Sequence, residues 1–477
     1  MIQVDILILL PLASAILCTL AGRQARWFAL LASLATAGVA VSALTNDFST
    51  GSAVHGSLER LGVIPSWALT LDGLSAPLVG LAAFLGIIAV LASWGVDDRP
   101  AAHHALLLFL EGAVMGVFLA EDIILFYVFW EAVLIPMFFL IGVWGHEDRK
   151  HAAIKFFLYT FLGSALMLVG ILTAVFTTSL THISDLATVS DAFASRSMFW
   201  LLAIGMLVKI PVVPLHTWLP DAHVEAPTAG SILLAGVLLK MGGYGLLRVA
   251  MPLAPAGYDE ARGILAVLGI VGIVYGAAMA LAQTDLKRLV AYSSVAHMGF
   301  VVLAVSAGTT QGSVGAVLVM VSHGVVAGLL FLLVGQLYER THTRDIARFG
   351  GLGKVVPGWA TALTFGALAS LGLPGLSGFP GEFVAALEGF RAFGWWIVPA
   401  AVGLVLAAAY NLRAVREVNH GPSVDEWSGL KDLALRDWIP VLALSAAILV
   451  LGVWPRLVAD LAEPAAAALM ALVGGGA

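Results

Sequence analysis

The segment that decides the fold runs from residue 199 to residue 220 and reads FWLLAIGMLVKIPVVPLHTWLP, with Lys209 inside an apolar stretch. A second apolar stretch follows at residues 228–247, TAGSILLAGVLLKMGGYGLL, and contains Lys240. Both are long enough to cross a bilayer, since a helix of about 20 residues spans the hydrocarbon core. A cation at that depth costs at least about 2.5–3.5 kcal/mol on insertion scales. The sequence therefore predicts two buried membrane lysines, with ion or proton transfer as their default role.

The chain as a whole has the composition of a membrane protein. It is 60% hydrophobic and 11% charged, against roughly 45–50% and about 25% for an average soluble domain. The apolar residues gather into runs long enough to span hydrocarbon. We therefore predict an all-α polytopic membrane protein with about 14 transmembrane helices, at residues 3–21, 27–45, 72–95, 105–120, 122–144, 156–178, 199–218, 229–250, 262–282, 288–306, 312–337, 358–391, 395–415 and 438–458.

The cations are distributed unevenly between the two faces that these helices define. Sixteen of the 24 Lys and Arg residues lie in connections from an odd-numbered to an even-numbered helix, and six lie on the opposite face. The positive-inside rule then places the first face in the cytoplasm and both termini outside. The first helix follows Met1 without a basic segment or a small-residue cleavage site, so we expect a retained helix rather than a signal peptide.

Nothing in the sequence indicates a cofactor held by this chain. Cys18 is the only cysteine, which excludes a disulfide or a cysteine-ligated iron–sulfur cluster within the chain. No glycine-rich nucleotide fingerprint follows a strand. His216 and His223 lack metal-site spacing to other ligands, so no metal is predicted. We expect the lipid bilayer and protons as partners, and no nucleic acid.

Two predicted helices are interrupted by proline beside an ionisable residue. Helix 7 has Pro211 and Pro214 just after Lys209, and helix 12 contains GLPGLSGFPGEF at 372–383, which ends next to Glu382. Broken backbone at membrane depth survives only where protein or a wet cavity satisfies it. Breaks five helices apart predict two inverted five-helix repeats. The expected division of the chain is 1–104 (helices 1–3), 105–250 (helices 4–8), 262–415 (helices 9–13) and 416–477 (a loop and helix 14).

Seven ionisable residues fall inside the predicted spans. A rise of about 1.5 Å per residue puts Lys209 and Lys240 about 15–16 Å deep, near the midplane. A nearby carboxylate stabilises a charged lysine whereas desolvation favours the neutral form, so a moving partner can load or release its proton. Histidine is a natural intermediate carrier. The candidate proton-transfer residues are Glu111, Glu131, Lys209, Lys240, His297, His323 and Glu382.

Each candidate also has a purely structural alternative. Lys209, Lys240 and Glu131 would then belong to ion pairs without a transport role. Glu111 would satisfy a neighbour, and the two histidines would be ordinary buried hydrogen-bonding residues.

Four segments resemble the antiporter-like subunits of respiratory complex I, a family that also includes subunits of cation/proton antiporters and of membrane-bound hydrogenases. The resemblance covers roughly helices 3–14. Within the family, Glu382 in place of the usual helix 12 lysine, and a chain that stops soon after helix 14, favour the M-type (chain 4) branch over the L-type and N-type branches. The segments are FYVFWEAVLIPMFFLIGVWG (126–145), KIPVVPLHTWLPDAHVEAPTAGSILLAGVLLKMGGYGLLR (209–248), TDLKRLVAYSSVAHMGF (284–300) and LPGLSGFPGEF (373–383).

The resemblance implies a role for each buried group. Glu131 and Lys209 match the charge pair between helices 5 and 7, and Lys240 matches the lysine on the central axis. His297 and His323 match the bridging histidines that follow it.

At the far end of the line, Glu382 matches the terminal group that exchanges with the outer compartment, and Glu111 matches a helix 4 glutamate. The implied function is proton translocation by a membrane-arm subunit of an NADH–quinone oxidoreductase in a bacterial inner membrane. NADH, FMN, iron–sulfur clusters and quinone are expected in partner subunits, and L-type and N-type chains as neighbours. Quinone reduction elsewhere would change the field on Glu131 and send a proton along the line.

Three alternatives remain at this stage. The first is a subunit of a multisubunit Na⁺/H⁺ antiporter, against which Glu382 argues because those subunits usually keep the lysine. The second is a subunit of a membrane-bound hydrogenase. A membrane scaffold is the third, and the cost of so many buried charges argues against it.

Overall fold

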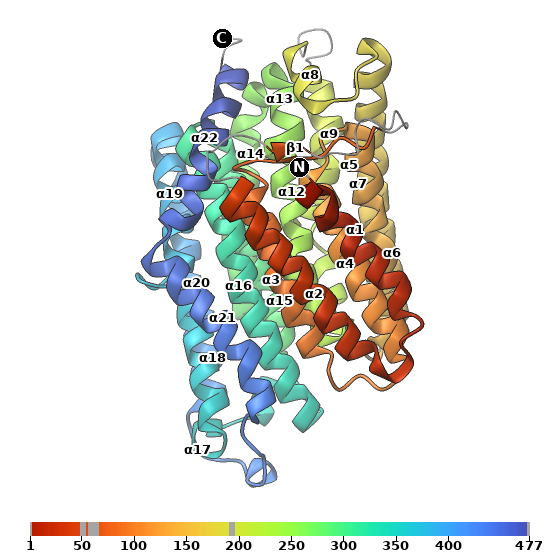
Figure 1. Ribbon diagram of the computed structural model, residues 1–477. Helices are drawn as coiled ribbons and strands as arrows, with labels where there is room; N and C mark the ends of the chain where they lie inside the picture. The colour runs from red at the N-terminus through yellow and green to blue at the C-terminus, as the bar shows by residue number, and fades with distance from the viewer. Residues whose placement is uncertain (1, 48–53, 56–65, 190–195, 475–477) are drawn as a thin grey trace.

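The computed structural model describes residues 2–47, 54–55, 66–189 and 196–474. Over these residues the chain is a bundle of long helices that run between an upper and a lower end (Figure 1). A two-stranded antiparallel ribbon, β1 (Val54–His55) and β2 (Thr70–Leu71), lies toward the upper end. The predicted all-α membrane fold is confirmed.

The first part of the bundle follows the predicted helices, except that the fifth is divided in two. Pro136 has no N–H to donate to the carbonyl of Ala132, so the helix is interrupted directly after Glu131 and Ala132. The helices are α1 (Ile2–Cys18), η1 (Gly22–Gln24), α2 (Ala25–Ser42), η2 (Ala43–Asp47), α3 (Ala76–Ala92), α4 (Pro100–Leu119), α5 (Ile123–Ala132), α6 (Leu134–Trp144), α7 (Arg149–Thr178) and the short α8 (Ile183–Thr188).

Helices 7 and 8 are the least regular of the middle part. Helix 7 is broken over residues 210–217, as predicted, into α9 and α10. Helix 8 comprises α11 to α13 and runs without a break from Thr228 to Leu253. It contains two π-helical stretches, η5 and η6, which the sequence did not indicate. The elements are α9 (Arg196–Lys209), α10 (Trp218–Glu225), α11 (Thr228–Leu233), η5 (Leu234–Leu238), α12 (Leu239–Gly245), η6 (Leu246–Ala250), α13 (Met251–Leu253), α14 (Pro255–Leu281), α15 (Leu286–Ser306) and α16 (Thr310–Thr341).

Helix 12 is the second broken helix, and it runs in the opposite direction to helix 7 (Figure 1). Its halves are separated by residues 371–377, where Gly372 and Gly375 adopt positive φ angles of 78° and 93°. The elements of this part are η7 (Ile346–Arg348), α17 (Leu352–Val355), α18 (Pro357–Ser370), α19 (Gly378–Phe393), η8 (Gly394–Ile397), α20 (Val398–Asn419), η9 (Asp425–Trp427), α21 (Leu435–Val453) and α22 (Arg456–Gly474).

Two differences concern the number of helices. Within the described ranges, 11 helical segments are long and apolar enough to cross a membrane, and Gln3–Cys18 and Ala76–Ala92 are shorter apolar helices. The number 14 therefore stays a prediction. The helix α22 was not predicted as an element of its own; it begins after Pro455, which ends the run of α21, and packs on α16 at the upper end.

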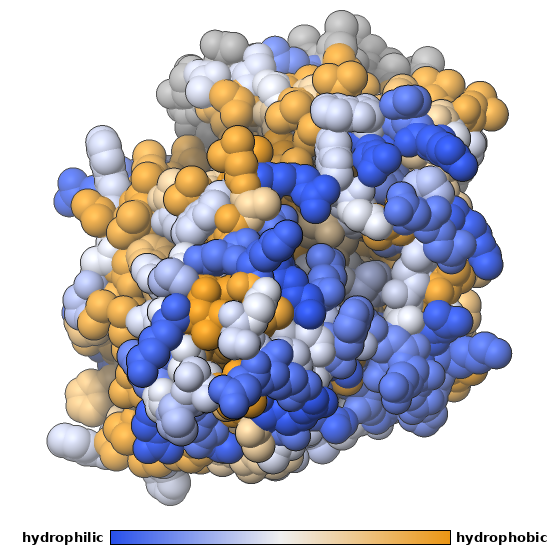
Figure 2. All heavy atoms as spheres, turned by 90° about the horizontal axis from the view of Figure 1, so that it is seen from below, coloured by the Kyte–Doolittle hydropathy of each residue, from blue (hydrophilic) through white to orange (hydrophobic). Residues whose placement is uncertain are grey.

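Hydrophilic residues gather at the lower end, where every odd-to-even connection lies. Seen from below, this face is largely hydrophilic, with apolar residues along part of its rim (Figure 2). Arg23, Arg99 and Arg344 are among the cations there. Arg60, one of the six cations predicted on the opposite face, lies outside the described residues. The assignment of the lower end to the cytoplasm stays a prediction.

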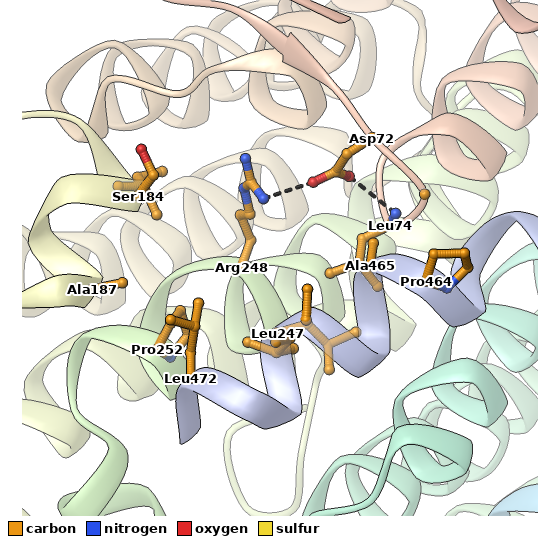
Figure 3. A pocket seen from close by; sticks show the side chains of 14 residues that line it. Asp72, Leu74, Ser184, Ala187, Leu247, Arg248, Pro252, Pro464, Ala465 and Leu472 are labelled. Carbon is orange, nitrogen blue, oxygen red and sulfur yellow. Dashed lines mark hydrogen bonds and ion pairs between the residues drawn. The ribbon is translucent and has the colours of Figure 1, made fainter. Parts of the chain in front are cut away.

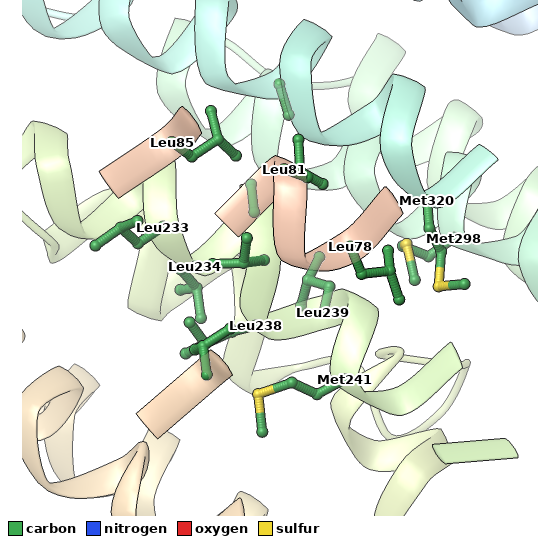
Figure 4. Close-up of a cluster of buried hydrophobic side chains, with 14 of the residues drawn as sticks. Leu78, Leu81, Leu85, Leu233, Leu234, Leu238, Leu239, Met241, Met298 and Met320 are labelled. Atoms are coloured by element: carbon green, nitrogen blue, oxygen red, sulfur yellow. The ribbon is translucent and has the colours of Figure 1, made fainter. Parts of the chain in front are cut away.

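The centre of the bundle is formed by helix 8, α15 and α16, which are almost wholly buried. Leucines of α3 and helix 8 meet there with methionines of α15 and α16 (Figure 4). In contrast, α19 to α22 bury only a small part of their surface and lie at the periphery. The central helices therefore hold Lys240, His297 and His323 away from the bilayer.

A close helix contact joins α14 and α15 at Gly269 and Gly299. A Cβ at Gly299 would lie 2.7 Å from the Gly269 carbonyl oxygen and 2.8 Å from the Ile273 nitrogen. Small residues allow membrane helices to approach this closely. Because α15 carries His297, this contact also sets the position of that histidine.

We expect Gly299→Ala to lower the amount of assembled subunit in the membrane several-fold, since overpacking a tight contact costs about 1–3 kcal/mol. The matched control is Gly263→Ala on α14, where a Cβ would meet nothing within 4 Å. Membrane abundance and the thermal midpoint of the solubilised protein measure the effect. Equal values for the two variants would contradict this account of the contact.

Candidate functional site

The Lys240 side chain is held between a backbone carbonyl and a histidine. Its Nζ donates to the Ala235 carbonyl and lies 2.6 Å from His323 Nδ1. Ala235 belongs to the π-helical stretch η5, directly before α12. Stretches of this kind inside α-helices occur frequently at functional sites. Lys240 is completely buried and His323 nearly so, so helix 8 and α16 form a direct polar link in the protein interior.

His323 is followed by a second histidine and a carboxylate. The rings of His323 and His297 lie 5.7 Å apart between centroids, and His297 Nδ1 lies 2.6 Å from Glu382 Oε1. Ser370 Oγ lies 3.2 Å from the other ring nitrogen of His297. His297, His323 and Glu382 line one small internal cavity. Four of the predicted residues thus form one connected series from Lys240 to Glu382, here called the buried line.

The broken helix 12 is what brings Glu382 into this series. Residues 371–377 interrupt the helix, and α19 then places Glu382 in its second turn, facing α15. The Glu382 Oε2 atom is directed toward Gly372, where a Cβ would lie 3.2 Å away. The last carboxylate of the buried line therefore has one oxygen on His297 and the other toward the break.

Lys209 and Glu131 lie near each other but do not form a direct pair. Glu131 is close enough to act electrostatically on the Lys209 ammonium, yet within the described ranges no ion pair of 4.0 Å or less joins them, and Lys209 Nζ has no hydrogen-bond partner. Instead, Nζ lies 5.4 Å from the centre of the Trp130 ring and 5.9 Å from that of Phe156. Such contacts favour the cation. Lys209 also ends α9, where the helix dipole favours positive charge.

Glu111 lies apart from the buried line. It accepts a hydrogen bond of 2.9 Å from Ser33 Oγ and packs against Gly86, where a Cβ would collide with its carboxylate. Its Oε1 is buried without a partner among the residues that the structure describes. Helices α2, α3 and α4 therefore enclose this carboxylate, and the structure does not bring it into contact with the other six residues.

His223 is a buried residue that sequence reasoning left out of the series. It is completely buried in α10, and its ring stacks on Phe331 with 4.4 Å between centroids. Both ring nitrogens lack a partner among the described residues, and the ring is close enough to interact electrostatically with Lys240 and His323. The sequence signal that could have identified His223 is its place in the broken helix 7. From the sequence alone, we consider this histidine only as a candidate metal ligand.

Two cations secure the lower end of α10. Lys287 Nζ donates to the Ala226 carbonyl at 2.5 Å, and Arg344 donates to the Val224 carbonyl at 2.6 Å. These carbonyls are the unsatisfied end of a helix, where positive charge is stabilising. Nearby, burial together with the positive charges of Lys287 and Arg344 lowers the pKa of His146 to about 3. His146 therefore remains neutral at physiological pH.

An open pocket at the upper end contains none of the predicted site residues. Arg248 lies in it, bound to Asp72 Oδ2 at 2.7 Å and also to Glu121 (Figure 3). Apolar residues of α22, such as Leu472, form the opposite wall. The arginine of this pocket is already paired with two carboxylates. These ion pairs hold elements of the upper end together. Within the described part of the chain, no group of three or more His, Cys, Asp or Glu residues is placed to hold a metal ion.

Comparison with known proteins identifies the class. Residues 120–407 match the family model described as "NADH:quinone oxidoreductase/Mrp antiporter, TM". A chain of respiratory complex I from Thermus thermophilus superimposes with a TM-score of 0.90 at 34% identity, over 98% of this chain and 99% of that one. A chain of the Mrp complex from Dietzia gives a TM-score of 0.86 at 21% identity, over 98% of each chain, which shows a shared fold alone.

The protein is thus an antiporter-like, multi-pass membrane subunit. NADH-quinone oxidoreductase subunit M of Rhodobacter capsulatus is 41% identical over 98% of this chain and 96% of that protein. The chain belongs to the family of NADH-quinone oxidoreductase M subunits.

Proposed function

We propose that this subunit translocates protons across the membrane, and that redox chemistry in other subunits drives it without any redox cofactor of its own. The observation that carries the proposal is the buried line, in which Lys240, His323, His297 and Glu382 follow one another within hydrogen-bond distance or adjacent ring contact. A structural ion pair needs two such groups, and four titratable groups in series are more than pairing requires.

The first and last steps of the transfer each have a donor and an acceptor within hydrogen-bond distance. A protonated Lys240 gives its proton to His323 Nδ1 and becomes a neutral amine, leaving an imidazolium. The proton then passes to His297, whose ring lies in the same small cavity, through ring reorientation or a bridging water. From His297 Nδ1 it moves to Glu382 Oε1, which becomes a carboxylic acid. Release toward the break of helix 12 restores the carboxylate.

Lys209 and Glu131 have a different role in this proposal. Because their separation leaves the ammonium over two aromatic rings rather than on the carboxylate, the charge of Lys209 is free to respond to changes around Glu131. A closer approach of Glu131 stabilises charged Lys209, and withdrawal favours its neutral form. The pair therefore acts as a switch that sets the field on Lys240, and Lys240 acts as a carrier.

The family to which the chain belongs supports a proposal for the setting of the subunit. We infer assembly with other subunits of an NADH–quinone oxidoreductase, with L-type and N-type chains as neighbours, in a bacterial inner membrane with both termini outside. NADH, FMN, iron–sulfur clusters and quinone would reside in those partners. A multisubunit Na⁺/H⁺ antiporter is the alternative that the shared Mrp fold keeps open. If flavin and iron–sulfur clusters, detected by their absorbance, purify together with this chain, the chain belongs to the redox complex rather than to the antiporter.

The experiment that tests the proposal replaces His323 in the intact complex and reconstitutes it into proteoliposomes. His323→Ala removes the acceptor beside Lys240, and we expect NADH-driven proton translocation to fall several-fold, with water substituting in part. His420→Ala, at an exposed position on the lower end, is the control. An assembled His323→Ala complex that translocates protons at the control rate and stoichiometry would refute the proposal.

A further inference from the structure

A polar cavity opens at the lower end of the bundle, away from the buried line. It lies between the ends of α3, α11, α16 and α21, and its polar lining includes Thr228, Gln336, Glu339 and Asp437. The lower end is the face that the charge distribution assigns to the cytoplasm. The cavity therefore begins on the side from which protons are taken up if the subunit exports them.

Two side chains of this cavity have oxygen atoms without a partner within the described ranges. Glu339 is exposed at the mouth, and within the described ranges its carboxylate makes no hydrogen bond or ion pair, although Arg340 and Arg436 lie nearby. Both arginines pair instead with Asp437, at 2.6 and 3.8 Å. Deeper in, Gln336 is 6% exposed, and its Oε1 has no partner in the part of the chain described. Buried polar atoms are normally satisfied, and water is the usual partner where protein supplies none.

His223 contacts residues that adjoin the lining of this cavity. Leu332 lines the cavity, and the ring of the preceding residue, Phe331, stacks on the His223 ring. Thr228 also lines it and starts α11, and one turn further Ser231 Oγ donates to the His223 carbonyl at 3.1 Å. His223 in turn lies within electrostatic reach of Lys240 and His323. His223 is thus a polar residue that contacts neighbours of the cavity lining and also interacts with the start of the line.

We propose that this cavity is the proton intake of the subunit, with Glu339 as the group that accepts protons at its mouth. Glu339 takes a proton from the aqueous phase to become a carboxylic acid. Water held by Gln336 and Thr228 passes the proton to a ring nitrogen of His223, and the Glu339 carboxylate is restored. The imidazolium of His223 then protonates a neutral Lys240. This inference rests on the proposed function, because it supplies the protons that the buried line carries.

Other titratable groups at the lower end are less suited to this task. His146 remains neutral because burial and two adjacent cations lower its pKa to about 3. The Glu225 carboxylate is occupied by the backbone N–H of Asp148 at 3.0 Å. Asp437 is held by Arg340 and Arg436. Among these groups, Glu339 combines solvent access, a carboxylate without a partner and a place in the cavity.

The test uses the intact complex in proteoliposomes with NADH as electron donor. Glu339→Gln removes the titratable group, and we expect a several-fold lower rate of proton translocation, with Glu339→Asp retaining most of the rate. Gln336→Leu removes the polar atoms deeper in the cavity at similar volume and should lower the rate comparably. The control is Glu426→Gln, an exposed carboxylate of the same face that pairs with Arg348 at 2.6 Å.

A chemical rescue separates proton transfer from structure. Glu339→Cys is treated with a carboxyethyl methanethiosulfonate, which restores an acid, or with an aminoethyl reagent, which installs an amine. We expect only the acid to restore translocation, relative to the equally treated wild-type complex. Cys18 of this chain is buried. Rescue by both reagents, or wild-type rates in Glu339→Gln and Gln336→Leu, would overturn the proposal that this cavity is the proton intake. If His323→Ala is impaired at the same time, the proposed function stands without it; if His323→Ala is also normal, both fail.

Discussion

Replacing Lys240 with alanine is expected to lower NADH-driven proton translocation by at least about tenfold, because a positioned proton-transfer group typically contributes 10²–10⁴-fold. The substitution removes the first member of the buried line and leaves His323 Nδ1 and the Ala235 carbonyl without their shared partner. No other titratable side chain among those described contacts His323 Nδ1. The remaining members therefore keep their geometry but receive no proton.

Lys240→Arg distinguishes a carrier from a structural cation. Arginine keeps the positive charge but does not release its proton in proteins. If Lys240 is a carrier, Lys240→Arg should be impaired as severely as Lys240→Ala. The measurement is proton uptake per NADH oxidised in proteoliposomes, with Lys354→Ala at an exposed position of the lower end as control. An active Lys240→Arg complex would show that the residue serves only as a buried cation.

Replacing Lys209 with alanine is expected to reduce turnover and proton translocation together, also by about tenfold or more. The variant removes the charge that responds to Glu131, so changes at Glu131 no longer reach Lys240. The switch requires Lys209 to lose its charge when Glu131 withdraws, and arginine does not release its proton in proteins, so Lys209→Arg should be impaired as well. A guanidinium can also lie against the Trp130 and Phe156 rings, so this variant separates the loss of proton release from the loss of those contacts.

The switch also predicts strong coupling between the two residues. In a double-mutant cycle, Glu131→Gln should cost little more once Lys209 is alanine, since contacting or charge-coupled residues are not additive. Additive losses in the cycle would show that Glu131 and Lys209 act independently. A Lys209→Ala complex that assembles and keeps the wild-type proton-to-electron ratio would refute the role of Lys209 altogether. Assembly is checked in each case from the abundance of the complex in the membrane.

The sequence was sufficient for the membrane class, the two broken helices and the buried titratable residues. These features depend on local chemistry: apolar runs of spanning length, prolines that remove backbone donors, and charges within those runs. The division of the fifth helix after Glu131 was also readable in principle from Pro136. The π-helical stretch beside Lys240 was not, because nothing in the composition of residues 234–238 marks it.

Which buried side chains contact each other was harder to predict from the sequence. The predicted series follows the chain from Lys240 through His297 and His323 to Glu382. The structure exchanges the two histidines: Lys240 contacts His323, and His297 contacts Glu382. The expected direct pair of Glu131 and Lys209 is instead a separated one, with aromatic rings against the ammonium. Glu111 proved to be enclosed with Ser33, and His223, which we had set aside, lies beside the line.

By itself, then, the sequence determined that lysines lie at membrane depth and that two helices break beside ionisable residues. Spacing along one chain fixes the depth of a residue in its helix, since the rise per residue is constant. It does not fix which way a side chain faces, or which distant helix lies opposite. Only the packing of α15 and α16 against helices 8 and 12 decided that Lys240 meets His323 and that His297 meets Glu382. The physical reason is that such contacts join residues 83 and 85 positions apart, and these distances depend on the whole bundle rather than on any single segment.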